Sequence, residues 1–264
     1  MGLRSGIFKL ARGATAVGAT SIGCFYLFTR KCQWHEINDA SDSIMTSRFF
    51  NKYNPWHNPT LIDVCVRRVR LSDLPPELVS DMRQGGTKLI ERFCGGVWGG
   101  FGESDTRIGL SDKNEYTGLV LTKNGWMDLG FTPQRLLWAK LFRGLPGRST
   151  QLWESADLFA SNYEIGTIVT DHLEVIAKEP TSILFRAGKS QGTAGESLRD
   201  HDSLLEVAID PDFDAGVADL SIKTAMYQGA SKAATTEKPM EKVQRLHMWY
   251  TELLMESALY YLRR

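Results

Sequence analysis

Roughly the last hundred residues constrain the fold most, because four strand-like runs there precede one long helix. The runs are residues 164–177, 182–188, 203–210 and 217–227, and the helix spans residues 239–262. Short joins between the runs are typical of antiparallel strands, since parallel neighbours need a long crossover. Pro239 suits a helix start, where its missing N–H would be unpaired in any case. The order predicts an α+β fold, with a curved antiparallel sheet wrapped around a long C-terminal helix.

Apolar and polar side chains alternate within each run, which predicts that one face of the sheet turns toward a core. In the first run the more apolar set carries Asp171 inward, whereas its neighbour His172 points to solvent. In the second run Arg186 points outward. The helix repeats apolar residues three and four positions apart, as a core-facing helix does. The predicted inner face, around one cavity, consists of Val169, Asp171, Phe185, Val207, Leu220, Ile222, Val243, Leu246, Tyr250 and Leu253.

The segment before these runs is predicted to open with one strand and two short helices. Residues 61–71 alternate and are rich in β-branched side chains, as in a strand. Pro75 and Pro76 signal a helix over residues 77–84. Thr87 then caps a second helix, so a helical layer would follow the first strand directly.

Two further elements are predicted between these helices and the four runs. Asn124 and Gly125 lie between strand-like runs, and an Asn-Gly pair in that setting predicts a β-hairpin. A helix over residues 132–142 follows, with apolar side chains on almost every side. Such a helix is either buried or lies against a membrane.

Residues 94–102 hold five glycines around Trp98 and Phe101. A Walker phosphate loop would need Gly-Lys-Ser/Thr at its end, whereas Glu103 and Ser104 follow here. Nucleotide binding is therefore disfavoured. Two interpretations remain open, which are a mobile aromatic flap beside the pocket and a tight turn where backbone segments pack closely.

Residues 1–31 carry five basic side chains and no acidic one. The uncharged run 13–29 is near the lower length limit for crossing a bilayer. A short single-span anchor, a mitochondrial targeting segment, and a cleaved secretory signal or uninserted helix all fit this pattern. We expect a membrane-associated, single-pass protein in a mitochondrial or endomembrane compartment.

Residues 32–59 are polar with isolated aromatic side chains. Two X-Pro steps within residues 54–59 favour extended backbone. This predicts an arm packed on the domain surface, or one in which Trp56 or His57 touches a membrane or a partner. The expected domains are therefore the segment 1–31, the arm 32–59 and a folded domain over residues 60–264.

Composition excludes several function classes. The chain has 31 Lys and Arg against 31 Asp and Glu, so it lacks the basic balance of a nucleic-acid-binding protein. Its four cysteines show no metal-ligand spacing, and a disulfide scaffold is disfavoured in a chain of this size. We expect no metal, no cofactor and no nucleic-acid partner, and the sequence does not define an oligomeric state.

The order of elements over residues 60–262 resembles the helix-grip fold of the START-like (SRPBCC) superfamily. That fold has a strand, two helices, a run of antiparallel strands and a long C-terminal helix. The inserted helix over residues 132–142 departs from the pattern. The resemblance implies that a hydrophobic small molecule binds between the sheet and the C-terminal helix. It also implies that catalysis of a non-redox step is the less common case.

Asp171 is the candidate catalytic residue, because a carboxyl group buried in an apolar strand face is suited to proton transfer on a ligand. The alternative is that Asp171 is satisfied by backbone or by a basic side chain, or that a bulge turns it outward. The candidate ligand-binding residues are Trp98, Trp126, Val169, Phe185, Val207, Leu220, Ile222, Tyr227, Leu246, His247 and Tyr250.

Three functions fit this sequence. The first is a membrane-tethered domain that binds a lipid, an isoprenoid or a polyketide-like molecule. The second is a cofactor-free cyclase, isomerase or dehydratase acting on a polyketide- or terpenoid-like metabolite. The third is a non-catalytic scaffold or assembly protein with a filled core. The sequence does not decide whether the protein is an enzyme, and a ligand pocket of typical size would argue against the scaffold.

Overall fold

The structure is a computed structural model of the whole chain. It describes residues 23, 25–35, 42–100, 132–188, 197–234, 236–238 and 244–263. The predicted hairpin around residues 124–125, Trp126 and Val243 lie outside this part of the chain. The chain divides into two compact units, Met1–Lys31 and Cys32–Arg264.

The first unit is described only at its end, where residues 25–29 are helical. Over the residues that the structure describes, no helix combines the length and the apolar character needed to cross a membrane. Most of the uncharged run 13–29 lies outside those residues.

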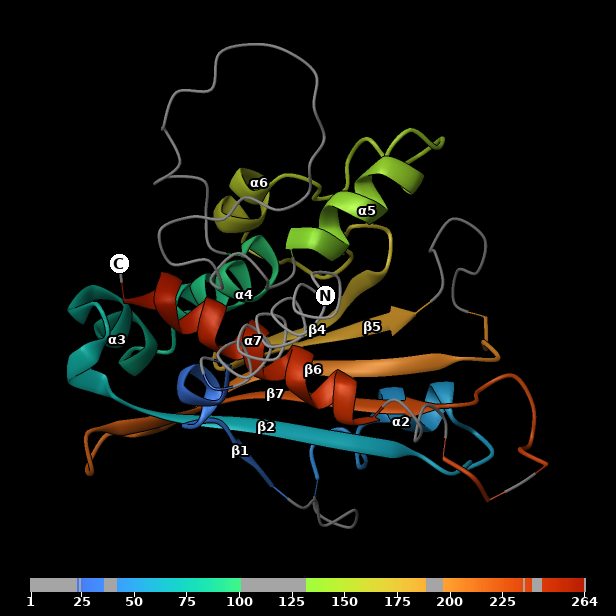
Figure 1. Cartoon of the computed structure of the whole chain (residues 1–264), viewed down its shortest axis with the longest axis horizontal. Coiled ribbons are helices and arrows are strands. Elements are labelled where there is room, and N and C mark those ends of the chain that lie inside the picture. The colour runs from blue at the N-terminus through green and yellow to red at the C-terminus, as the bar shows by residue number, and fades with distance from the viewer. Residues whose placement is uncertain are drawn as a thin grey trace, which may run out of the picture. The chain divides into compact units, whose positions relative to one another are not determined.

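The second unit is built on a curved antiparallel sheet, with the strands in the order β1-β2-β7-β6-β5-β4-β3 among the described residues (Figure 1). The strands are β1 (Gln33–Trp34), β2 (Leu61–Arg70), β3 (Ile168–Val169), β4 (Leu173–Glu179), β5 (Ser182–Gly188), β6 (Asp202–Asp212) and β7 (Val217–Tyr227). Strands β3 to β7 follow one another as neighbours, and β2 adds to the far side of β7. The first predicted strand therefore lies beside the last one.

Helices cover both faces of this sheet. They are α2 (Arg48–Tyr53), α3 (Pro76–Arg83), α4 (Lys88–Gly99), α5 (Thr132–Phe142), α6 (Ser155–Ala160) and α7 (Gln244–Leu262), with a 3-10 turn at Leu71–Asp73. The main core joins α4 and α7 to one sheet face, while α2 packs on the opposite face. This α+β arrangement of an antiparallel sheet with a long C-terminal helix is compatible with a helix-grip fold.

Where the structure describes residues 32–59, at 32–35 and 42–59, they form more than an extended arm. They contain β1 and α2, which the sequence did not predict. The Ser47 side chain accepts a hydrogen bond from the Phe50 amide and so caps α2. Phe50 and Tyr53 then pack against Leu204 and other side chains of the sheet.

The first of the four predicted runs, residues 164–177, is interrupted. After β3, Thr170 and Asp171 take positive φ angles of 50° and 63° before β4 begins at Leu173. Left-handed backbone reverses the chain within two residues, at a cost of order 1–3 kcal/mol per non-glycine residue. Asp171 therefore lies in a tight turn and not on a strand face.

The glycine-rich segment is helical as far as Gly99, so it forms neither the expected turn nor the expected flap there. Gly96 lies where α4 crosses α7, and an added Cβ would come within 2.6 Å of the Ala258 Cα. At Gly99 the same addition would meet the Phe159 ring. Trp98 is 2% exposed and packs edge-on to Phe185, with ring centroids 5.6 Å apart. The glycines serve close helix packing.

The C-terminal helix is rotated relative to the predicted stripe. Leu246 was expected to face the core but is 65% exposed. The side chains that α7 buries are Thr251, Leu254, Met255, Ser257, Ala258, Leu259 and Leu262. Contact with α4 through Ala258 fixes this rotation, and it leaves the N-terminal half of α7 open.

Arg186 points away from the main core, as expected, but it is buried on the other face of the sheet. It is 1% exposed and pairs with Asp202, with Nη2 and Oδ2 2.6 Å apart. Its guanidinium lies 3.8 Å from the centroid of the Tyr53 ring. The sequence could not show this, because the side chain that covers Arg186 comes from the unpredicted α2.

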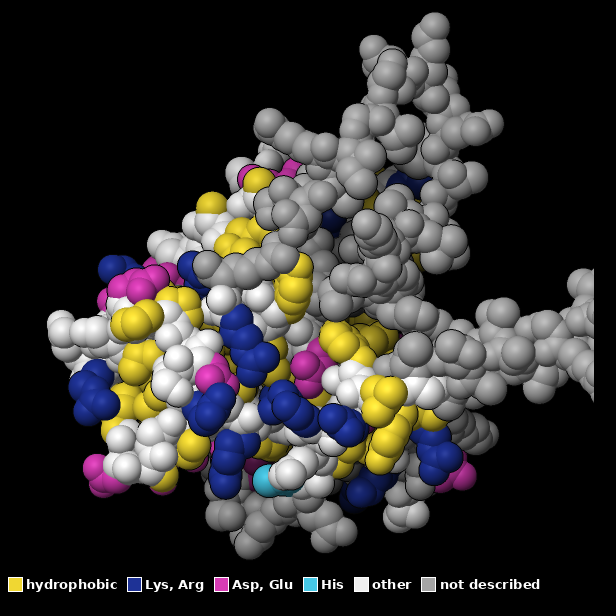
Figure 2. All heavy atoms as spheres, turned by 60° about the vertical axis from the view of Figure 1, so that its left-hand side comes forward, with side chains coloured by type: hydrophobic (Ala, Val, Ile, Leu, Met, Phe, Trp, Pro, Cys, Tyr) yellow, Lys and Arg dark blue, Asp and Glu magenta, His cyan; other side chains and the backbone are white. Residues whose placement is uncertain are grey.

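One face of the molecule carries both charges. On the face that brings α3 forward, Lys and Arg side chains stand beside Asp, Glu and hydrophobic ones (Figure 2). Exposed pairs such as Arg68 with Asp219 contribute to this pattern. Such a mixed surface fits the balanced composition of the chain.

The helix crossing gives the first test. Replacing Gly96 with Ala should lower the free energy of unfolding by about 1–3 kcal/mol, because the methyl group would press on the backbone of α7. The better helix propensity of alanine offsets only part of this. Urea unfolding would measure the change. In the control Gly144→Ala, nothing lies within 4 Å of the added methyl group, so stability should stay nearly constant. Equal stability of the two variants would contradict the close crossing.

Candidate functional site

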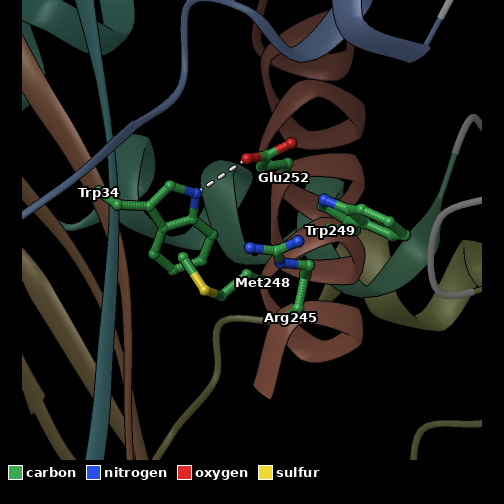
Figure 3. A pocket seen from close by; sticks show the side chains of 5 residues that line it. All are labelled: Trp34, Arg245, Met248, Trp249 and Glu252. Carbon is green, nitrogen blue, oxygen red and sulfur yellow. Dashed lines mark hydrogen bonds between the residues drawn. The ribbon is translucent and has the colours of Figure 1, made fainter. Parts of the chain in front are cut away.

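A groove of about 380 Å³ lies between β1 and the open half of α7. Its lining residues are Trp34, Arg245, Met248, Trp249 and Glu252. Figure 3 shows Trp34 on the strand side and Trp249 on the far side, with the Arg245 and Glu252 side chains between them. The Trp34 indole Nε1 donates a hydrogen bond of 2.8 Å to Glu252 Oε1, which ties the strand to the helix.

Simple periodicities bring these side chains together. Met248, Trp249 and Glu252 follow Arg245 by three, four and seven positions, so all four side chains lie on one side of α7. Trp34 is placed by the pairing of β1 with β2, in which it lies opposite Cys65. Because β1 is an edge strand of only two residues, the groove opens at the margin of the sheet.

Polar contacts clamp α7 to β2 beside this groove. Arg67 Nε lies 3.0 Å from Glu256 Oε1. His247 Nδ1 lies 3.2 Å from Asp63 Oδ2, and Gln244 Nε2 donates to Asp63 Oδ1 at 2.7 Å. These contacts are buried, since Asp63 and Arg67 are only 5% and 7% exposed.

Cys32 contacts this clamp through its thiol. Its Sγ donates a 3.6 Å hydrogen bond to Glu256 Oε1. A hydrogen bond with the Cys65 thiol, followed by burial and the nearby carboxylates, raises the pKa of Cys32 far above its usual range. A thiol that stays protonated is a poor nucleophile, so Cys32 is unsuited to covalent catalysis.

The groove combines apolar walls with two opposite charges. Two indoles and a thioether offer surface for an apolar group, and an indole face also attracts a cation. Glu252 supplies negative charge and Arg245 supplies positive charge at the same opening. Such a site can bind an amphipathic molecule with a charged or dipolar head. No group of three His, Cys, Asp or Glu side chains among the described residues is placed to hold a metal ion.

Most of the predicted ligand-binding residues lie elsewhere. Six of them belong to the packed main core, namely Trp98, Val169, Phe185, Val207, Leu220 and Ile222. Tyr227 lies on the opposite face of the sheet, against Phe50. Trp126 is outside the described residues. The three predicted on α7 share their helix with four of the groove residues, although none of them lines the groove.

Those three side chains point in different directions. Leu246 is exposed, and His247 reaches Asp63 on β2. Tyr250 donates a 2.5 Å hydrogen bond to Gln134 on α5, and burial raises the pKa of its hydroxyl above the usual range. The groove residues were missed because the stripe of α7 predicted to be buried is shifted by one residue from the one that the structure buries. Their common helical face was the available signal.

Asp171, the candidate catalytic residue, is buried and paired. It is 0% exposed, and its Oδ1 lies 2.8 Å from Arg148 Nε. Gln151 Nε2 donates to the same oxygen at 3.1 Å. The pairing with a basic side chain corresponds to the alternative reading of the sequence, in which the carboxyl group stabilises the fold.

His172 stacks on α5 and does not point to solvent as predicted. Its ring lies 3.7 Å from that of Trp138 at an interplanar angle of 7°, and Phe142 packs on it edge-on. Burial lowers the pKa of His172, although its hydrogen bond to the Thr170 carbonyl and the nearby Asp171 oppose this. The turn at Thr170 and Asp171 places His172 on the α5 side.

Comparison of the chain with protein families, with curated proteins and with solved structures finds no match. The function is therefore inferred from the geometry of the groove and of the surfaces around it.

Arg148→Met should lower the free energy of unfolding by about 3–5 kcal/mol, because it leaves the buried Asp171 carboxylate without its cation. Adding Asp171→Asn should recover part of the loss. The matched control is Arg68→Met, whose partner Asp219 is partly exposed and whose own side chain is 69% exposed, so it should cost less than about 1 kcal/mol. Chemical denaturation of the four proteins tests this, and equal losses at Arg148 and Arg68 would speak against a structural role for Asp171.

Stability should also fall as the pH drops below 6.5, the ordinary pKa of histidine. Because burial lowers the folded-state pKa of His172, the unfolded chain takes up its proton at a higher pH than the folded chain does. The stabilisation is complete above pH 6.5 and is lost as the pH falls toward the lowered value. His172→Gln should flatten this part of the profile in thermal unfolding, whereas His201→Gln, at an exposed position, should not. Identical profiles for both variants would refute the assignment.

Proposed function

We propose that residues 32–264 form a START-like, helix-grip domain that binds a small hydrophobic or amphipathic molecule between the sheet and the C-terminal helix. The groove between β1 and α7 is the observation that carries this proposal. Its volume of about 380 Å³ lies at the lower end of the range for ligand pockets, about 300–1,000 Å³. The site therefore suits a compact molecule, or the head and first carbons of a larger lipid.

The chemistry of the groove narrows the ligand further. Trp34 and Trp249 bury apolar area without long flexible chains, so little side-chain entropy is lost on binding. Arg245 favours a carboxylate or phosphate group on the ligand, whereas Glu252 favours an ammonium group. An amphipathic molecule with an ionic or zwitterionic head satisfies both features better than a pure hydrocarbon does.

We further infer that residues 1–31 tether this domain to a membrane. The support comes from the sequence, in which the uncharged run 13–29 is bracketed by basic residues. Basic flanks and interfacial aromatic side chains such as Tyr26 are typical of membrane-anchoring segments. A tether of this kind would keep a lipid-binding groove near its source of ligand.

A second candidate is a scaffold without a ligand. It is favoured by the packing of the predicted inner face, where Val207, Leu220 and Ile222 are all buried in one core with α4 and α7. In that case the groove would be a surface irregularity between an edge strand and a helix.

Native mass spectrometry of the full chain, purified from its host in mild detergent, separates the two candidates. Ligand binding predicts a co-purifying small molecule whose Kd rises about tenfold in Trp249→Ala, a loss of about 1.4 kcal/mol, so that its occupancy falls. Trp56→Ala is the matched control, since Trp56 and Trp249 are 51% and 50% exposed and only Trp249 lines the groove. Recovery of empty protein alone, or equal occupancy in both variants, would favour the scaffold.

A further inference from the structure

Helix α5 presents leucines to solvent on one side. Leu136, Leu137 and Leu141 are 57%, 55% and 56% exposed, and Leu145 in the following turn is 44% exposed. We call these four residues the leucine face. Single exposed leucines are common on protein surfaces, but four within ten residues of one helix and its turn form a patch that marks an interaction surface.

The opposite side of α5 is fixed to the domain. Trp138 stacks on His172, and buried Arg135 donates a 2.9 Å hydrogen bond to the Trp153 carbonyl. Arg143 forms an ion pair with Glu154. Because these contacts all lie on the inner side and at the end of α5, the leucine face is held outward by the fold.

The turn that carries Leu145 is held as well. Arg148 reaches the buried Asp171 carboxylate, and the Trp153 indole donates a 2.9 Å hydrogen bond to the Arg148 carbonyl. The buried ion pair thus fixes the loop that extends the leucine face beyond the helix.

Basic side chains outnumber acidic ones around the leucine face, where Glu154 pairs with Arg143. Residues 132–153 contain Arg135, Lys140, Arg143 and Arg148 and no Asp or Glu. Lys140 is exposed one turn from Leu136 and Leu137, and the Arg143 side chain is 55% exposed. Leucines bordered by basic side chains are the pattern of helices that lie in the interface of an anionic bilayer.

We infer that the leucine face of α5 docks on an anionic lipid surface. The leucines enter the boundary between headgroups and acyl chains, while the exposed Lys140 meets the headgroup phosphates and carboxylates. A polar protein partner would leave the leucines unmatched, and a second copy of this helix would bring like charges together. This docking does not depend on the ligand groove and adds a second membrane contact to the proposed tether.

The test must localise contact within the full chain, because the segment 1–31 could bring every variant to a membrane. Hydroxyl-radical footprinting with mass spectrometry reads the exposure of individual side chains. On vesicles of phosphatidylcholine with about 30% phosphatidylserine, labelling of the leucine face should fall about fivefold. Protection should weaken on phosphatidylcholine alone, and also in about 0.5 M salt, where charges are strongly screened.

Three variants sharpen the result. Leu137→Asp combined with Leu141→Asp should abolish protection of Leu136 and Leu145, and Lys140→Glu should weaken it on anionic vesicles. Ile165→Asp is the control, because Ile165 is 67% exposed outside α5 and the change should leave protection of the leucine face intact. Circular dichroism would check that all three variants fold.

Several outcomes would overturn the inference. Unchanged labelling of the leucine face on anionic vesicles would exclude docking, and equal protection on neutral vesicles would exclude the anionic preference. Protection that appears without vesicles as the protein concentration rises would assign the leucine face to contact between copies of the chain.

Discussion

The crossing of α4 over α7 determines much of the rest of this structure. Without a Cβ on Gly96, the two helices approach until Ala258 touches the backbone of α4. Both helices then lie on the same face of the sheet and fill it with their side chains. The space that a helix-grip domain would use for a deep cavity is therefore packed at this end of α7. Open volume is left where α7 extends past α4, beside β1.

Buried ion pairs fix the parts of the domain that hydrophobic packing does not specify. Asp171 and Arg148 hold a turn with left-handed backbone, and Arg186 and Asp202 hold α2 against the second sheet face. Removing charges from water is costly, so a buried pair adds little net stability compared with apolar side chains of the same size. We infer that it adds specificity, because these loop arrangements bring both charges of each pair together. The same argument applies beneath α7, where Asp63 contacts His247 and Arg67 pairs with Glu256.

The sequence predicted the sheet well because strand alternation is a local signal. Strands β5 and β7 have the predicted bounds, and Phe185, Val207 and Leu220 face the core as expected. The errors arose where distant contacts decide the outcome. The rotation of α7 depends on α4, which also makes Leu246 an exposed residue. Arg186 is buried by a helix that begins in a polar stretch. Asp171 lies in a left-handed turn, where it pairs with Arg148, a residue 23 positions earlier in the chain.

For the candidate site, sequence periodicity contained part of the answer. The groove residues of α7 recur on one face of the helix. Which face of α7 is buried and which lines the groove depends on where α4 packs against it. Trp34 could not be assigned from sequence, since a two-residue edge strand carries no alternation to detect. Sequence alone supports the class of fold, whereas the groove had to come from the structure.

One hydrogen bond joins α7, which lines the groove, to α5, which carries the leucine face. Tyr250 follows the groove residue Trp249 directly and donates its hydroxyl to Gln134 in the first turns of α5. A displacement of Trp249 that turned the helix would therefore strain a short hydrogen bond to α5. Conversely, a surface that holds α5 also restrains the open half of α7, which is the less buried half of that helix. The groove would therefore be most rigid when α5 is held by a surface.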